Sequence, residues 1–101
     1  MGQLWRHGDV LIGAVKARPT DAKALNHLIL ARGEVTGHSH RVADRDTARL
    51  YELNGVLYLD VVAALATVIH EEHGPITLPQ GTYRVWIQRE YAPGAIRHVV
   101  D

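Results

Sequence analysis

The sequence predicts an all-β protein, either a sandwich or a barrel of short strands. Turn residues interrupt the apolar segments at intervals of about eight to twelve positions, as they do in such folds. Asn54-Gly55 lies between two apolar segments and is the strongest short-range hairpin signal in the chain. With 101 residues and no repeat or linker, residues 1–101 are expected to form a single domain.

The expected strands follow one another along the chain. The first lies within residues 8–17, which are rich in Val, Ile and Leu, and Pro19 ends it. A second apolar run covers residues 25–31, and the two arms of the Asn54-Gly55 hairpin come next. The last strand alternates in residue type from Thr82 to Tyr91, and residues 92–101 form either a tail or a short closing strand.

Residues 61–73 fit two structures. Apolar residues recur there at helical spacing, with Asp60 as a possible N-cap and Gly74 as a possible C-cap. A strand is favoured because the hairpin leads directly into the segment, because many of its residues are β-branched, and because Pro75 follows. We therefore expect a strand here.

Composition excludes several classes of protein. Eleven basic and eleven acidic residues cancel, which argues against a dedicated nucleic-acid binder and favours self-association, so a homodimer is expected. The longest apolar run, residues 61–66, is too short to span a membrane, and the first residues do not resemble a signal peptide. A cytoplasmic protein is expected. Without cysteine, disulfides and thiolate metal ligands are excluded, and a bound metal is one way to stabilise so small a domain.

Four of the seven histidines fall in two short segments, TGHSHRV and VIHEEHGPI. On a strand, His38 and His40 point to the same face and can chelate one ion. His70 and His73 would be neighbours on a helix, whereas on a strand His70 shares a face with Glu72. The zincin motif, in which two histidines are four apart, is not matched.

These histidines predict a site for one divalent transition-metal ion, such as Cu, Fe, Zn or Mn. The expected ligands are His38, His40 and His73, with His70 as either a fourth ligand or a neighbour that orients one. Three ligands would leave a position open for water or substrate. A cluster of neutral histidines that senses pH is an alternative. The remaining histidines are interpreted as surface or satisfied core residues: His7, His27 and His98.

Other residues are candidates for chemistry near the ion. Glu72 could act as an acid or base, although adjacent acids such as Glu71 and Glu72 are more often simply exposed. Arg89 or Tyr91 could contact a substrate, or could belong to a solvated strand end. Four of the large aromatic residues could stack on a sugar or form part of the core; these four are Trp5, Tyr58, Tyr83 and Trp86.

Gly33 and Gly37 before His38-Ser39-His40, a later histidine, and the turn residues Pro75, Pro79 and Gly81 resemble the cupin family. The glutamate that normally follows the first cupin motif is absent, and the Pro and Gly residues follow the second pair of histidines instead of preceding it. The resemblance implies a small jelly-roll β-barrel with a metal on His38, His40 and one or both of the later histidines, with Glu72 in place of the missing glutamate or an all-histidine site.

The expected function is therefore a small metal-dependent enzyme, an oxidoreductase or a hydrolase. Its expected substrate is a small molecule or a carbohydrate-like compound. The alternatives are a non-catalytic metal- or ligand-binding module, in which the ion stabilises the domain, and a protein-interaction domain with incidental histidines.

Overall fold

The computed structural model describes residues 3–33 and 36–88, which form an all-β fold, as predicted. The strands are β1 (Leu4–His7), β2 (Val10–Val15), β3 (Lys23–Ala24), β4 (Ile29–Arg32), β5 (Ser39–Val42), β6 (Ala48–Leu53), β7 (Val56–Ile69) and β8 (Ile76–Ile87). A short 3₁₀ turn, η1 (Arg45–Thr47), precedes β6. No helix in the described part of the chain is long and apolar enough to cross a membrane.

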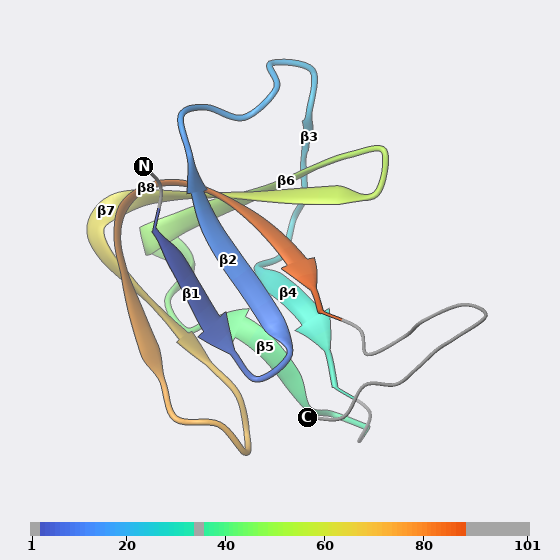
Figure 1. Cartoon of the computed structure of the whole chain (residues 1–101), viewed down its shortest axis with the longest axis vertical. Helices are drawn as coiled ribbons and strands as arrows, with labels where there is room; N and C mark the ends of the chain where they lie inside the picture. Colours follow the sequence, from blue (N-terminus) through green and yellow to red (C-terminus); the bar gives the residue numbers. More distant parts are fainter. Residues whose placement is uncertain (1–2, 34–35, 89–101) are drawn as a thin grey trace.

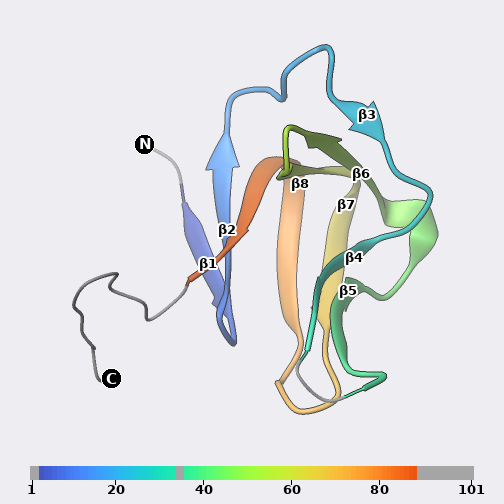
Figure 2. The ribbon, with the colours of Figure 1, turned by 90° about the vertical axis from the view of Figure 1, so that its right-hand side faces the viewer.

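All strands belong to one antiparallel sheet that curls into a half-barrel (Figures 1 and 2). The main strand order is β1-β2-β8-β7-β5-β4. Strand β6 pairs with the first residues of β7, Val56–Val61, and β3 pairs with β6. The long strand β7 therefore pairs with β8 along one edge and with both β6 and β5 along the other. The pairing of β7 with β8 shifts register between Val61 and Leu65, and such irregularities bend a strand and increase its twist.

The predicted hairpin is confirmed. Asn54 and Gly55 have φ angles of 52° and 82° and connect β6 to β7. Positive φ at both positions is the conformation that a tight two-residue hairpin turn requires, and Asn and Gly adopt it most readily. The strand expected from residue 61 onward is also confirmed, as far as Ile69. The apolar residues of this segment have helical spacing, but they form a strand because both edges of β7 are hydrogen-bonded to other strands of the sheet.

Two features differ from the strands expected. Strand β1 was not anticipated, because it has only four residues, but it pairs with β2 through a tight turn at Gly8 and Asp9. Strand β8 begins at Ile76 and runs through Pro79 and Gly81, which had indicated a turn. Pro79 is tolerated because it lies opposite Leu65, where the register with β7 is irregular.

The core lies on the concave face of the sheet. Alternate residues of neighbouring strands point inward and are almost fully buried, including Ile12, Leu50, Leu59, Val68 and Leu78. Trp5 packs edge-to-face against buried Tyr83, with ring centroids 5.5 Å apart. These two aromatic residues therefore have a core role, whereas Trp86 is 38% exposed.

Candidate metal centre

Five histidines come together at one end of the half-barrel. His7 comes from the end of β1, His40 from β5, His38 from the residue just before β5, and His70 and His73 from the β7–β8 loop. The β1–β2 turn, the start of β5 and this loop lie at the same end of the molecule in both Figure 1 and Figure 2. The curl of the sheet brings them together, because β1 and β5 are four strands apart in the strand order.

Three of these rings lie close enough together to be candidate ligands of one ion. Nitrogen atoms of His40, His70 and His73 all lie within 4.8 Å of one another. A tetrahedral ion with metal–nitrogen bonds of about 2.0–2.1 Å would need nitrogen atoms about 3.3 Å apart, so the rings would have to move closer together than the 4.8 Å limit to coordinate it. His40 is buried, His70 is half-buried and His73 is exposed, so one side of the group faces solvent.

His7 determines which nitrogen of His40 is free. The Nε2 atom of His7 is 2.9 Å from the carbonyl oxygen of Gly74, which can only accept, so this nitrogen carries the proton. Neutral His7 then accepts at Nδ1 from the Nδ1–H group of His40, which is also 2.9 Å away. The lone pair on His40 Nε2 is left for an ion. Metal-binding histidines are commonly oriented in this way, through a hydrogen bond from the second ring nitrogen.

The buried surroundings of His40 and His7 favour the neutral form of both rings. Burial, reinforced mainly by neighbouring His70 and His7, lowers the pKa of His40 from 6.5 to about 4. Burial also lowers the pKa of His7, although its hydrogen bond to Gly74 opposes that change. Since a metal binds only the deprotonated nitrogen of imidazole, the lowered pKa of His40 favours binding at neutral pH.

His70 is held by the backbone of the loop. Its Nδ1 atom accepts a hydrogen bond of 2.9 Å from the N–H group of Glu72. In the neutral ring the proton is then on Nε2. Ligation by neutral His70 through either nitrogen would therefore break the Glu72 hydrogen bond, because a ring that ligates through Nε2 carries its proton on Nδ1. The Glu72 side chain, by contrast, is 63% exposed.

His38 lies at the edge of this group. Its ligand atom falls within 4.8 Å of those of His70 and Glu71, and its Nδ1 atom is 3.5 Å from a carboxylate oxygen of Glu72. However, both oxygens of Glu71 are already engaged, one by the Ser39 N–H at 3.0 Å and the other by Arg41 at 2.9 Å. The Ser39 hydrogen bond is the main cause that lowers the pKa of Glu71. This ion pair explains Glu71 better than metal ligation does.

The predicted ligands are thus brought together in part. His40, His70 and His73 form the compact group, whereas His38 precedes the first residue of β5 and does not share a group with His40. Glu72 lies beside the cluster, and Arg89 and Tyr91 lie outside the described residues. His98 also lies outside them, and exposed His27 instead accepts the N–H of Ile29.

Sequence reasoning missed His7 and Gly8. His7 had been interpreted as a surface or satisfied core residue; it is a satisfied core residue, 2% exposed with both ring nitrogens hydrogen-bonded, but its contact with His40 was not predicted. Gly8 has a φ of +64°, and a Cβ atom there would lie 2.8 Å from His73 Nε2 and 3.0 Å from His40 Cε1. The only signal was the order His-Gly-Asp before an apolar run, which is compatible with a tight turn between two strands.

The fold and the site define an all-β protein with a histidine cluster at one end of a half-barrel. The chain belongs to the family described as Domain of unknown function (DUF8820), whose model matches residues 6–88. The matched range contains all five clustered histidines. Neither the search of curated proteins nor the search of solved structures found a match.

Proposed function

We propose that this protein binds one divalent transition-metal ion through His40, His70 and His73 and acts as a small metal-dependent enzyme. The observation that carries the proposal is the convergence of three imidazoles, one of which is oriented by His7. A ligand set of imidazole nitrogens suits Zn, Cu, Fe or Mn better than Mg or Ca, which prefer oxygen ligands.

The exposure of the three candidate ligands to solvent on one side supports a catalytic role. Three protein ligands leave a coordination position for water or a small substrate, and His73 lies on the solvent side. In such a site the ion would polarise a substrate or activate a water, as hydrolases and oxidoreductases require. The Glu72 carboxylate, within reach of His38 and open to solvent, would exchange protons with a bound molecule.

A second candidate is an ion that stabilises the domain without catalysis. It is favoured by the position of the ligands, because His40 lies on β5 whereas His70 and His73 lie in the β7–β8 loop, beyond Arg41 and Ile69, where the pairing of β5 with β7 ends. An ion bound there would fix the loop against β5, and its binding free energy would add to the stability of the fold.

The cupin resemblance and the homodimer belong to the same proposal. The curled sheet and the buried His40 are compatible with a cupin-like barrel that holds a metal on inward-facing histidines. Exposed apolar residues on β7, Val62 at 48% and Leu65 at 56%, are compatible with a surface covered by a second copy.

Elemental analysis of the tag-free protein tests metal binding. We expect one ion per chain in the wild type, after reconstitution with Zn²⁺ if necessary, and much less in His40→Ala and His73→Ala. His27→Ala is the matched control, because His27 is exposed and lies outside the cluster. An equal loss in the control, or no loss in the first two variants, would refute the proposal.

Cobalt substitution distinguishes the two candidates. If the fourth position is open, adding azide to the Co²⁺-loaded protein should change its visible absorption spectrum in a saturable manner. A spectrum that does not respond to azide, together with a large rise in the unfolding temperature on loading, would favour the stabilising ion over the enzyme.

A further inference from the structure

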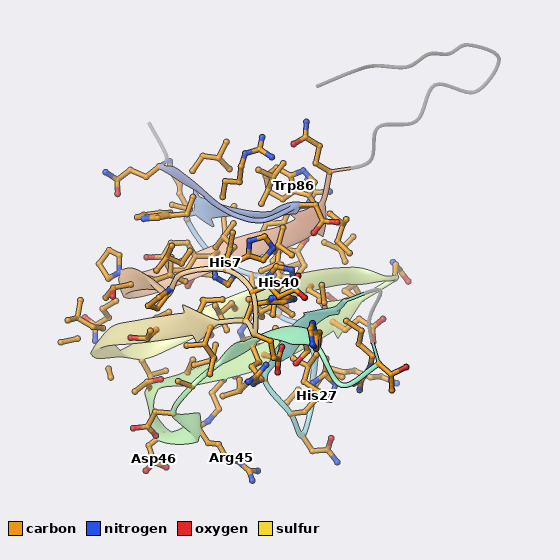
Figure 3. The ribbon with its side chains drawn as sticks, turned by 90° about the horizontal axis from the view of Figure 1, so that it is seen from below. His7, His27, His40, Arg45, Asp46 and Trp86 are labelled. Atoms are coloured by element: carbon orange, nitrogen blue, oxygen red, sulfur yellow. The ribbon has the colours of Figure 1, made fainter. Side chains whose placement is uncertain are left out.

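A separate cavity of about 150 Å³ lies between the segment after β3, the turn η1 and the strand β6. Its polar lining residues are Asn26, His27, Arg45 and Arg49, and the half-buried Leu25 and Leu28 supply its apolar part. In Figure 3, His27 and Arg45 lie in the lower part of the view, apart from His7 and His40 near its centre. None of its lining residues belongs to the histidine cluster.

The charged groups of this cavity are all cationic. Arg45 and Arg49 line it, no carboxylate does, and neither guanidinium makes an ion pair within the described ranges. Arg49 lies opposite Asp60 in the β6–β7 register, but Asp60 is paired with Arg18 at 2.9 Å. Within the described part of the chain, neither guanidinium is therefore held in an ion pair, although Asp44 and Asp46 flank Arg45 in the chain and Arg49 donates to the Ala48 carbonyl at 3.2 Å.

His27 adds a donor. Its Nδ1 atom accepts the backbone N–H of Ile29 at 3.1 Å, so the neutral ring carries its proton on Nε2. Two guanidinium groups, an Nε2–H group and the amide of Asn26 together offer mainly hydrogen-bond donors. Such a set matches an anion, and arginine binds carboxylates and phosphates particularly well because its donors form a planar fork.

The apolar lining residues restrict the class of anion that fits the cavity. Leu25 and Leu28 are half-buried and pack against the core, so they supply the apolar surface of the cavity, whereas Leu50 is only 1% exposed. A ligand that fills the cavity would place a short hydrocarbon part against Leu25 and Leu28 and its charge beside the arginines. We propose that this cavity binds a small organic carboxylate, independently of any metal at the histidine cluster.

A titration followed by amide NMR tests this proposal, with butyrate as the probe and butyramide as its uncharged isostere. We expect saturable shifts confined to residues 25–28 and 45–50, and binding at least ten-fold weaker for butyramide. Inorganic phosphate, which lacks the hydrocarbon part, should also bind more weakly than butyrate. Tighter binding of phosphate would overturn the carboxylate assignment.

Variants establish which residues carry the binding. Arg49→Gln and Arg45→Gln should each weaken butyrate binding about ten-fold, because each loses a charge-assisted hydrogen bond. Arg84→Gln is the matched control, since Arg84 is also exposed but lies over Trp86 and does not line the cavity. Dispersed amide spectra would show that the variants are folded. Equal binding by butyrate and butyramide, or equal weakening in the control, would overturn the proposal.

Discussion

The buried His40 ring should make the stability of the metal-free protein depend on pH. Its pKa is lowered from 6.5 to about 4 in the folded protein, primarily by burial. Between these two values the unfolded chain binds more protons at this position than the folded chain does. Unfolding should therefore become easier as the pH falls from about 6.5 to about 4, and stability should be regained as the pH rises through the same range.

The size of the effect follows from the two pKa values. At about 1.4 kcal/mol for each pH unit, the difference between 6.5 and about 4 corresponds to a loss of about 3 kcal/mol by pH 4. This is a large part of the roughly 5–15 kcal/mol by which a small domain is stable. The full difference between the two pKa values can be used for His40 because the residue is only 3% exposed, so water screens the charge of its ring little.

Urea unfolding at a series of pH values, in the presence of a chelator, measures this loss. Acidic residues also titrate over the range, so the decisive quantity is the difference between the wild type and His40→Gln, whose amide does not titrate. The variant should lose about 3 kcal/mol less than the wild type between pH 7 and pH 4. His27→Gln, at an exposed position, should behave like the wild type. Equal losses in the wild type and His40→Gln would refute the reasoning.

Four further predictions follow from individual contacts. His7→Phe removes the acceptor of the His40 Nδ1–H group, so Zn²⁺ affinity, measured by competition with a chromophoric chelator, should fall about 10–100-fold; unchanged affinity would contradict the role given to His7. Gly8→Ala should weaken Zn²⁺ binding more than Gly55→Ala, because both glycines have positive φ but only a Cβ at Gly8 would meet His73 and His40; equal affinities would show that the contact is unimportant. Glu72→Gln should leave Zn²⁺ affinity within about three-fold, since Glu72 contacts His70 through its backbone; a large loss would identify its carboxylate as a ligand. Leu59→Ala should lower the free energy of unfolding in urea by about 2–5 kcal/mol, whereas Leu65→Ala, at a 56% exposed position, should lower it much less. Similar losses in the two variants would contradict the assignment of Leu59 to the core.

The sequence was sufficient for the local features of the fold. Asn54-Gly55 has few alternatives to a tight hairpin turn, and the β-branched residues after it favour a strand once the hairpin has formed. Strand β1 and the curl of the sheet depend on which strands become neighbours. That information lies in contacts between distant residues, such as β2 with β8, and not in any one segment.

The candidate site could likewise be predicted from the sequence only in part. The two histidine-rich segments identified four members of the cluster, but their assignment to one face rested on the assumption that the strand included His38. Strand β5 begins at Ser39, which leaves His38 closer to the His70 and Glu71 group. His7 could not be assigned to the site from its own segment, because it meets His40 only through the curl of the sheet, 33 residues away in the chain.

The most direct test of the account is a long-range proton–nitrogen NMR spectrum of the histidine side chains, recorded before and after one equivalent of Zn²⁺. Without metal, His40 should be protonated at Nδ1 and His7 at Nε2. With metal, the ¹⁵N shifts of His40 Nε2 and of one nitrogen each in His70 and His73 should change to values typical of coordination, while His7 and His27 stay uncoordinated. Binding of Zn²⁺ without any change at His40, or a His40 ring protonated at Nε2, would contradict the central claim.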